Sequence, residues 1–156
     1  MKLKTAICAV LITSSSISLA AGDGPYTFGG ILGDPTGVSG KLDLPNDTAI
    51  DGAIAWGFGG RSGGRIHGDY LEIRRGQMSA GDADLDLYYG MGARLVSING
   101  GGDSGKIAFG PRAPVGLLYQ SEGPNMEFFG EAALILDVIP SVSVDLDLAV
   151  GVRLRF

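Results

Sequence analysis

The last thirteen residues of the chain alternate strictly between large apolar side chains and small or charged ones. The apolar positions are Val144, Leu146, Leu148, Val150, Val152, Leu154 and Phe156, and between them lie Asp145, Asp147, Ala149, Gly151, Arg153 and Arg155. A helix would scatter these side chains around its axis, whereas a strand places the charges on one face and the large apolar groups on the other. The segment therefore predicts a long β-strand with one apolar and one polar face.

Seven upstream segments show the same period of two residues. They are centred on Tyr26–Gly33, Val38–Leu44, Ile50–Phe58, Ile66–Arg74, Leu85–Leu95, Arg112–Tyr119 and Glu127–Asp137. Clusters rich in Gly, Pro, Asn, Asp and Ser separate these segments, as at Gly33–Gly37 and Gly76–Asp82, and they are typical of turns. In Ile66–Arg74 the alternation is least regular, and we predict a β-bulge near Tyr70 and Leu71. Eight strands joined by seven turns indicate an all-β fold, an eight-stranded antiparallel up-and-down β-barrel.

The direction in which the apolar face points decides whether such a barrel is soluble or lies in a membrane. The polar face is rich in Gly, Ala and Ser, which suits the narrow interior of eight strands, and the chain has 27 glycines among 156 residues. The opposite face carries nearly all the Leu, Ile and Val, with aromatic residues near strand ends, as in membrane barrels. Several strands reach the ~9–11 residues that a tilted strand needs to cross a bilayer. We therefore predict a transmembrane barrel.

The N-terminus reads as a secretory signal peptide covering residues 1–20. Lys2 and Lys4 provide the positive region, Ala6–Ile12 the apolar core, and Ser18–Ala20 the small residues of a cleavage site. Cleavage after Ala20 leaves a barrel domain of residues 21–156 without cysteine, and its formal charge becomes −5 − 2 = −7. This acidic chain has no basic stripe, so nucleic acid is excluded as a partner.

The C-terminal segment Val150–Phe156 resembles the insertion signal of bacterial outer-membrane barrels, an alternating strand closed by an aromatic residue. This resemblance implies that Val152, Leu154 and Phe156 are recognised by the barrel-assembly machinery. The length after residue 20 resembles that of small eight-stranded barrels of the OmpA/OmpX type. Pro35–Lys41 together with Thr48–Gly52 is similar to a family of small outer-membrane barrels of unknown function. These likenesses imply a Gram-negative-type outer membrane and contact with its lipid, and they carry over no catalytic residue.

Charged side chains on the inner face predict a salt-bridge cluster, because buried charges must be paired. Counting from the strand centres puts Arg94, Arg112 and Glu131 near the middle of the membrane, with Asp147 close in register. We expect a cluster centred on Glu131 that plugs the lumen. The alternative function for the same residues is an ion path.

The sequence thus favours a non-enzymatic integral outer-membrane barrel with a structural or surface-interaction role. Three alternatives remain open: a narrow pore or ion channel, a lipid-modifying enzyme that uses His67, and a secreted soluble barrel that binds an apolar ligand. No cofactor motif and no metal motif is found, and the pattern does not define an oligomeric state. The loops expected on the outer side of the membrane are short, which favours weak surface contacts.

Overall fold

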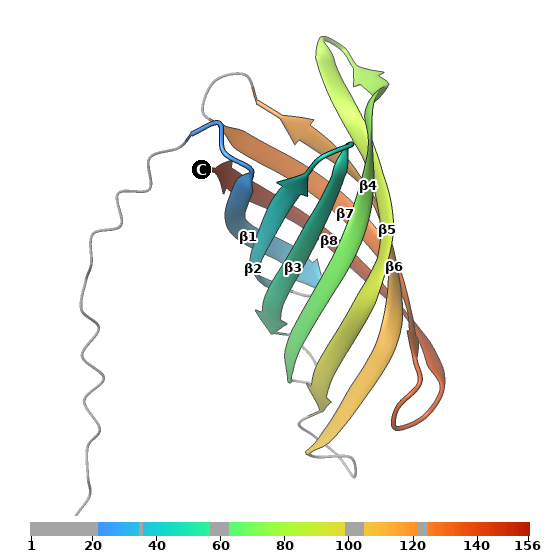
Figure 1. Cartoon of the computed structure of the whole chain (residues 1–156). Coiled ribbons are helices and arrows are strands. Elements are labelled where there is room, and N and C mark those ends of the chain that lie inside the picture. Colours follow the sequence, from blue (N-terminus) through green and yellow to red (C-terminus); the bar gives the residue numbers. More distant parts are fainter. Residues whose placement is uncertain (1–21, 35, 57–62, 99–104, 122–124) are drawn as a thin grey trace, which may run out of the picture.

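The computed structural model describes residues 22–34, 36–56, 63–98, 105–121 and 125–156. The strands are β1 (Tyr26–Asp34), β2 (Thr36–Leu44), β3 (Thr48–Trp56), β4 (Gly64–Ala80), β5 (Ala83–Ile98), β6 (Lys106–Gln120), β7 (Met126–Asp137) and β8 (Ser143–Arg155). Each strand pairs antiparallel with its neighbours in the chain, and β1 closes the ring against β8 (Figure 1). The predicted eight-stranded antiparallel up-and-down barrel is confirmed. In the described ranges, no helix is long and apolar enough to cross a membrane.

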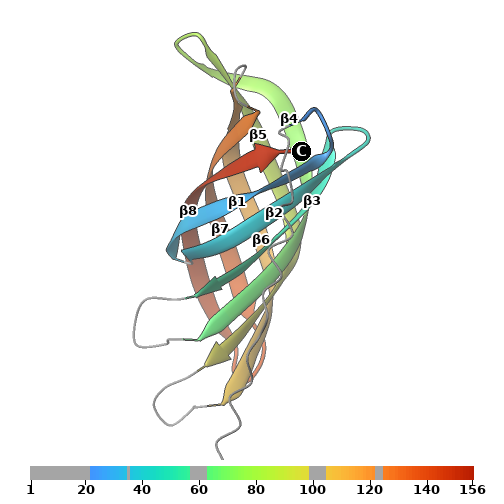
Figure 2. The same cartoon turned by 90° about the vertical axis from the view of Figure 1, so that its left-hand side faces the viewer.

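The ring is sheared, so its strands run obliquely across the barrel (Figure 2). A row of paired residues that starts at Thr27 on β1 ends at Asp145 on β8, whereas Thr27 itself pairs with Arg155, ten residues farther along β8. The row passes through Lys41, Asp51, Asp69, Gly92, Arg112 and Ile135. A shear of ten over eight strands corresponds to a tilt of about 40° and a radius of about 8 Å. Side chains can fill such an interior.

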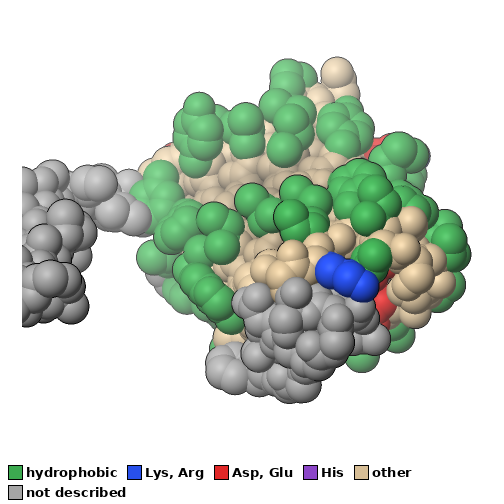
Figure 3. All heavy atoms as spheres, turned by 90° about the horizontal axis from the view of Figure 1, so that it is seen from below, with side chains coloured by type: hydrophobic (Ala, Val, Ile, Leu, Met, Phe, Trp, Pro, Cys, Tyr) green, Lys and Arg blue, Asp and Glu red, His purple; other side chains and the backbone are tan. Residues whose placement is uncertain are grey.

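The polarity of the barrel is the reverse of that of a soluble protein. Leu146, Leu148 and Val150 on β8 are 57%, 57% and 60% exposed. Asp147 and Arg153 on the same strand face the lumen and are each 3% exposed. Seen from below in Figure 3, apolar side chains ring the molecule. The predicted outward orientation of the apolar face is confirmed.

Strand β4 contains an irregularity, but at a different place from the one predicted. Tyr70 is exposed and Leu71 is buried, so the alternation continues through them, and the register shifts between Arg74 and Met78. The predicted bulge near Tyr70 and Leu71 is therefore wrong. Leu71 and Ile73 are apolar residues that point into the barrel, so hydrophobicity does not distinguish the two faces of this strand.

The hairpin formed by β4 and β5 projects beyond the ring at the end where the chain's C-terminus lies (Figures 1 and 2). We call this the terminal end, and we call the opposite end, where β1 ends at Asp34, the loop end. The turn predicted at Gly76–Asp82 is present but shorter than expected, because β4 continues to Ala80 and only Gly81 and Asp82 separate it from β5.

Arg75 fixes the root of this hairpin. Its Nε donates a hydrogen bond to Asp47 Oδ1 at 2.9 Å and its Nη1 donates to Asp86 Oδ2 at 3.1 Å. The amide of Gly76 donates to the other oxygen of Asp86 at 2.8 Å. Partial burial lowers the pKa of Arg75, but the hydrogen bond to Asp47 and the two carboxylate charges outweigh this and raise the pKa above its ordinary value.

Candidate functional site in the charged lumen

The inward-facing polar side chains form three clusters along the lumen. The terminal-end cluster consists of Lys41, Asp43, Asp51, Glu127, Arg153 and Arg155. The central cluster consists of Asp69, Tyr88, Arg112 and Glu131. The loop-end cluster consists of Arg65, Arg94, Asp137, Asp145 and Asp147, and the exposed Asp34 at the end of β1 joins it through Arg65. The ion pairs and hydrogen bonds within each cluster define these groups.

Arg153 is the hub of the terminal-end cluster. Its Nη1 lies 3.0 Å from Glu127 Oε1 and its Nη2 lies 3.1 Å from Asp51 Oδ2. The same guanidinium donates to the Ser39 hydroxyl and lies 4.0 Å from the centre of the Phe129 ring. One side chain from β8 therefore contacts β2, β3 and β7. Because it is 3% exposed, these charge-assisted contacts form in a low-dielectric interior.

Lys41 and Arg155 extend this cluster toward the terminal end. Lys41 Nζ lies 2.6 Å from Glu127 Oε2 and 2.8 Å from Asp43 Oδ1. Arg155 Nη1 lies 2.6 Å from the other oxygen of Asp43. Asp43 and Glu127 are thus each shared by two or more cations, which compensates the cost of burying their charges.

Arg112 organises the central cluster. Its Nη1 donates to Asp69 Oδ2 and its Nη2 donates to Glu131 Oε1. The Tyr88 hydroxyl donates to Glu131 Oε2 at 2.9 Å. Arg112, Asp69 and Tyr88 are each at least 97% buried. The cluster links four adjacent strands, β4 to β7, from inside.

Arg94 organises the loop-end cluster by contacting three aspartates. Its Nη2 lies 2.7 Å from Asp137 and 3.0 Å from Asp145, and its Nη1 lies 3.1 Å from Asp147. Arg65 reaches Asp147 at 3.2 Å, so β4 and β8, on opposite sides of the ring, are joined across the lumen. Among the described residues of this cluster, carboxylates outnumber cations.

The predicted cluster centred on Glu131 is divided in the structure. Arg112 lies with Glu131 as expected, but Arg94 lies with Asp147 in the loop-end cluster. The shear explains the difference, because each step from β1 toward β8 along a row of paired residues moves closer to the loop end. Counting from strand centres ignores this displacement.

The residues of the predicted insertion signal lie at the terminal end of β8. Val152 and Leu154 are 36% and 40% exposed on the outer face. Phe156 follows the strand, and its amide donates to the carbonyl of Tyr26 at 2.8 Å. The aromatic terminus is thereby attached to β1, at the seam that closes the ring.

Glycines separate the partners of several lumen contacts. Gly92 on β5 pairs with Asp69 on one side and with Arg112 on the other. Gly116 on β6 stands in the same way between Tyr88 and Glu131. Gly29 stands between Arg153 and Ser39, and Gly151 between Phe129 and Ile31. In each row the glycine leaves room for a long side chain to cross the intervening strand.

The space above these glycines is occupied by their neighbours. A Cβ added at Gly92 would collide with Asp69, and one added at Gly116 would collide with the Tyr88 ring. A Cβ at Gly151 would collide with the ring of Phe129. The glycine-rich composition therefore has a specific cause: glycines on the inner face provide the volume that the charged and aromatic side chains fill.

The predicted cluster did not include Tyr88 or Asp69, which the structure places against Glu131 and Arg112. Alternation defines a face, whereas partners depend on the register between strands. His67 alternates with the exposed Ile66 and is half-buried on the inner side of β4. Across the described part of the chain, no group of His, Cys, Asp and Glu is arranged to hold a metal ion.

No protein-family model, curated protein or solved structure matches this chain. Its function must therefore be inferred from the chemistry of the barrel itself.

Proposed function

We propose that this chain is an integral outer-membrane protein, a small eight-stranded barrel of the OmpA/OmpX type with a structural or surface-interaction role. The observation that carries the proposal is the reversed polarity. The outer face exposes large aliphatic and aromatic side chains on all eight strands, while Arg94, Arg112 and Arg153 are each at least 97% buried inside. Only an apolar surrounding phase makes that arrangement favourable.

The dimensions of the outer face support a membrane location. Strand β7 has 12 residues and, at a tilt of about 40°, covers about 30 Å along the barrel axis, close to the thickness of a hydrocarbon core. Exposed aromatics lie toward both ends, with Tyr26 and Phe128 near the terminal end and Trp56 and Phe109 near the loop end. Interfacial girdles of membrane barrels have this distribution.

The ion-paired lumen supports a plugged barrel rather than an open channel. Arg65 and Asp147 connect opposite walls, and Arg153 contacts three strands besides its own. Conduction would require several buried ion pairs to separate together, each separation leaving an uncompensated charge. Planar-bilayer recordings test this part of the proposal: we expect no steady conductance steps, and steps abolished by Arg112→Met would instead support the narrow pore.

The other two alternatives fit the geometry less well. A lipid-modifying enzyme built on His67 needs that side chain to reach lipid, but it lies on the inner side of β4. A soluble ligand-binding barrel needs an apolar interior, whereas the lumen contains ion pairs and the apolar groups face outward. We propose a non-enzymatic protein that contacts lipid through its outer face and uses β8 for recognition by the assembly machinery.

Cell fractionation combined with gel mobility tests the proposal. We expect the protein, after cleavage behind Ala20, in the outer-membrane fraction. We also expect unboiled protein to migrate differently from boiled protein, because the folded barrel resists the detergent. Recovery in the aqueous fraction without detergent would contradict the membrane location. Replacing Phe156 by Ala should lower the amount inserted in cells and leave refolding of the purified chain in detergent unchanged.

A further inference from the structure

A pair of opposite charges interrupts the apolar outer face near the terminal end of β4. Glu72 and Arg74 alternate with the buried Leu71 and Ile73 and therefore point outward. Their side chains form an ion pair and remain 43% and 56% exposed. Nε and Nη2 of Arg74 also donate to the Tyr89 hydroxyl at 3.4 and 3.2 Å. Three polar groups of different chemistry thus meet on the outside of the barrel.

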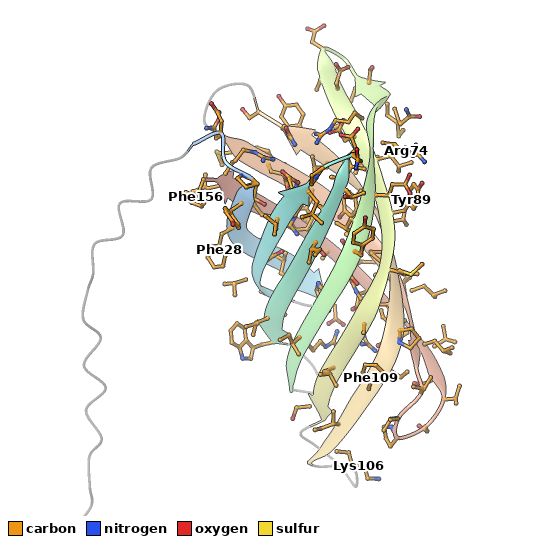
Figure 4. The ribbon with its side chains drawn as sticks, viewed as in Figure 1. Phe28, Arg74, Tyr89, Lys106, Phe109 and Phe156 are labelled. Atoms are coloured by element: carbon orange, nitrogen blue, oxygen red, sulfur yellow. The ribbon has the colours of Figure 1, made fainter. Side chains whose placement is uncertain are left out.

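The position of this group coincides with the end of the apolar belt. Glu72 pairs with Thr48, the first residue of β3, so the neighbouring strand begins at this level. The register shift of β4 starts at Arg74, beyond which the hairpin leaves the ring. Figure 4 shows Arg74 and Tyr89 next to each other on the outer side of the β4–β5 pair. In a membrane, this level is the interface where lipid headgroups begin.

The three groups are complementary to a headgroup that carries both a phosphate and an ammonium. A guanidinium can donate parallel hydrogen bonds to phosphate oxygens. The Tyr89 hydroxyl accepts from Arg74, so its own hydrogen can be donated to the same phosphate. The Glu72 carboxylate accepts hydrogen bonds from an ammonium. We propose that Glu72, Arg74 and Tyr89 bind the phosphoethanolamine headgroup of a membrane phospholipid, an inference that rests on the proposed membrane location.

The charge balance distinguishes phosphoethanolamine from other headgroups. Glu72 and Arg74 together are neutral, and so is a phosphoethanolamine lipid, whose two charges can each replace one side of the existing ion pair. A phosphoglycerol lipid has no cation for Glu72. A phosphocholine lipid has a cation without N–H donors, so its contact with the carboxylate lacks hydrogen bonds. Selectivity for ethanolamine therefore depends on Glu72, and overall binding of phosphate depends on Arg74.

Native mass spectrometry tests this assignment on the full-length barrel, released from vesicles of equal parts phosphatidylethanolamine, phosphatidylglycerol and phosphatidylcholine. We expect the wild-type protein to retain phosphatidylethanolamine preferentially. Arg74→Gln should reduce retention of all three lipids about tenfold, the factor expected for losing one charge-assisted hydrogen bond. Glu72→Gln should remove the preference for ethanolamine over glycerol and keep retention of the phosphate. The control is Lys106→Gln, which removes a positive charge at the loop end.

Two outcomes separate failure of this site from failure of the proposed function. Equal retention of the three lipids by the wild-type protein, or unchanged retention by a folded Arg74→Gln barrel, overturns the headgroup site while the membrane location stands. A wild-type chain that does not associate with the vesicles overturns the proposed function itself. Tyr89→Phe provides a second variant that removes only one oxygen, and we expect it to weaken retention by a smaller factor. Soluble phosphoethanolamine added in excess should compete if the headgroup alone is recognised.

Discussion

At the scale of single residues, the inner glycines determine which side chains can meet in the lumen. Tyr88 reaches Glu131 only because Gly116 lies between them on β6. A glycine on the outer face does not provide space for a neighbouring side chain in this way. At Gly130, an added Cβ would find its nearest neighbour, Val150 Cγ1, only at 4.0 Å. These two glycines allow a matched comparison within one barrel.

We predict that Gly116→Ala destabilises the barrel by about 1–3 kcal/mol, the usual cost of overpacking a filled interior. The added methyl group would collide with the Tyr88 ring and with the carbonyl of Gly130. Urea unfolding of the protein in detergent micelles measures the change. Gly130→Ala is the control and should leave the midpoint nearly unchanged. Equal effects of the two substitutions would contradict the role assigned to Gly116.

Among the residues that the structure describes, Arg112 is the cation bonded to both carboxylates of the central cluster. We predict that Arg112→Met costs about 3–5 kcal/mol, because Asp69 and Glu131 would remain buried without their cation. Arg74→Gln removes a guanidinium from an exposed pair and should cost below about 1 kcal/mol. The same unfolding experiment compares them. Similar losses for both variants would show that Arg112 does not compensate buried charges.

At the scale of elements, the β4–β5 hairpin extends beyond the ring. From Arg74 onward, the β4 residues through Ala80 are exposed. Beyond the register shift the two strands pair at Met78–Leu85, Ser79–Asp84 and Ala80–Ala83, and Arg75 and the Gly76 amide bond to Asp86. We predict that replacing residues 75–86 by a two-residue Asn-Gly turn leaves the barrel folded, because Arg74 and Leu87 already face each other. Retained heat-dependent gel mobility would verify this. Loss of the folded form would show that the contacts of Arg75 with Asp47 and Asp86 are needed to close the ring.

The position of the β4 bulge shows the limit of reading a strand in isolation. The apolar Leu71 and Ile73 face the lumen. The apolar positions therefore switch from the outer to the inner face although the backbone pairing stays regular. The true register shift, between Arg74 and Met78, occurs where β4 leaves the wall and binds Asp47 and Asp86 through Arg75. Those partners come from a turn and from another strand, so no local pattern could locate the shift.

At the scale of the whole molecule, the reversed polarity predicts how the surface responds to charge. Leu148 lies midway along β8 and is 57% exposed. We predict that Leu148→Arg destabilises the barrel in phospholipid vesicles by about 2–4 kcal/mol, the cost of an arginine near the middle of a bilayer. Reversible unfolding in vesicles measures this effect, and folding efficiency should fall with it.

Val142 provides the control for that experiment, because it lies in the β7–β8 turn and is 75% exposed. Val142→Arg should change the stability by less than about 1 kcal/mol, as expected near or beyond the interface. In a soluble barrel both substitutions would place a charge in water, and neither would be costly. Equal and small effects would therefore contradict the membrane location.

The sequence by itself determined the number of strands, their antiparallel order and, except in β4, the side of the strand that carries charge. These properties are local, because a period of two residues and turn chemistry are read within one segment. It also indicated that Arg112 and Glu131 lie together, since they occupy inward positions on adjacent strands. Only the tertiary structure decided that Arg94 joins Asp147, that glycines separate the lumen partners, and that β4 and β5 extend past the ring. These features depend on the shear between strands, which is defined only when all eight strands close into a ring. The sequence of a single strand therefore cannot reveal it.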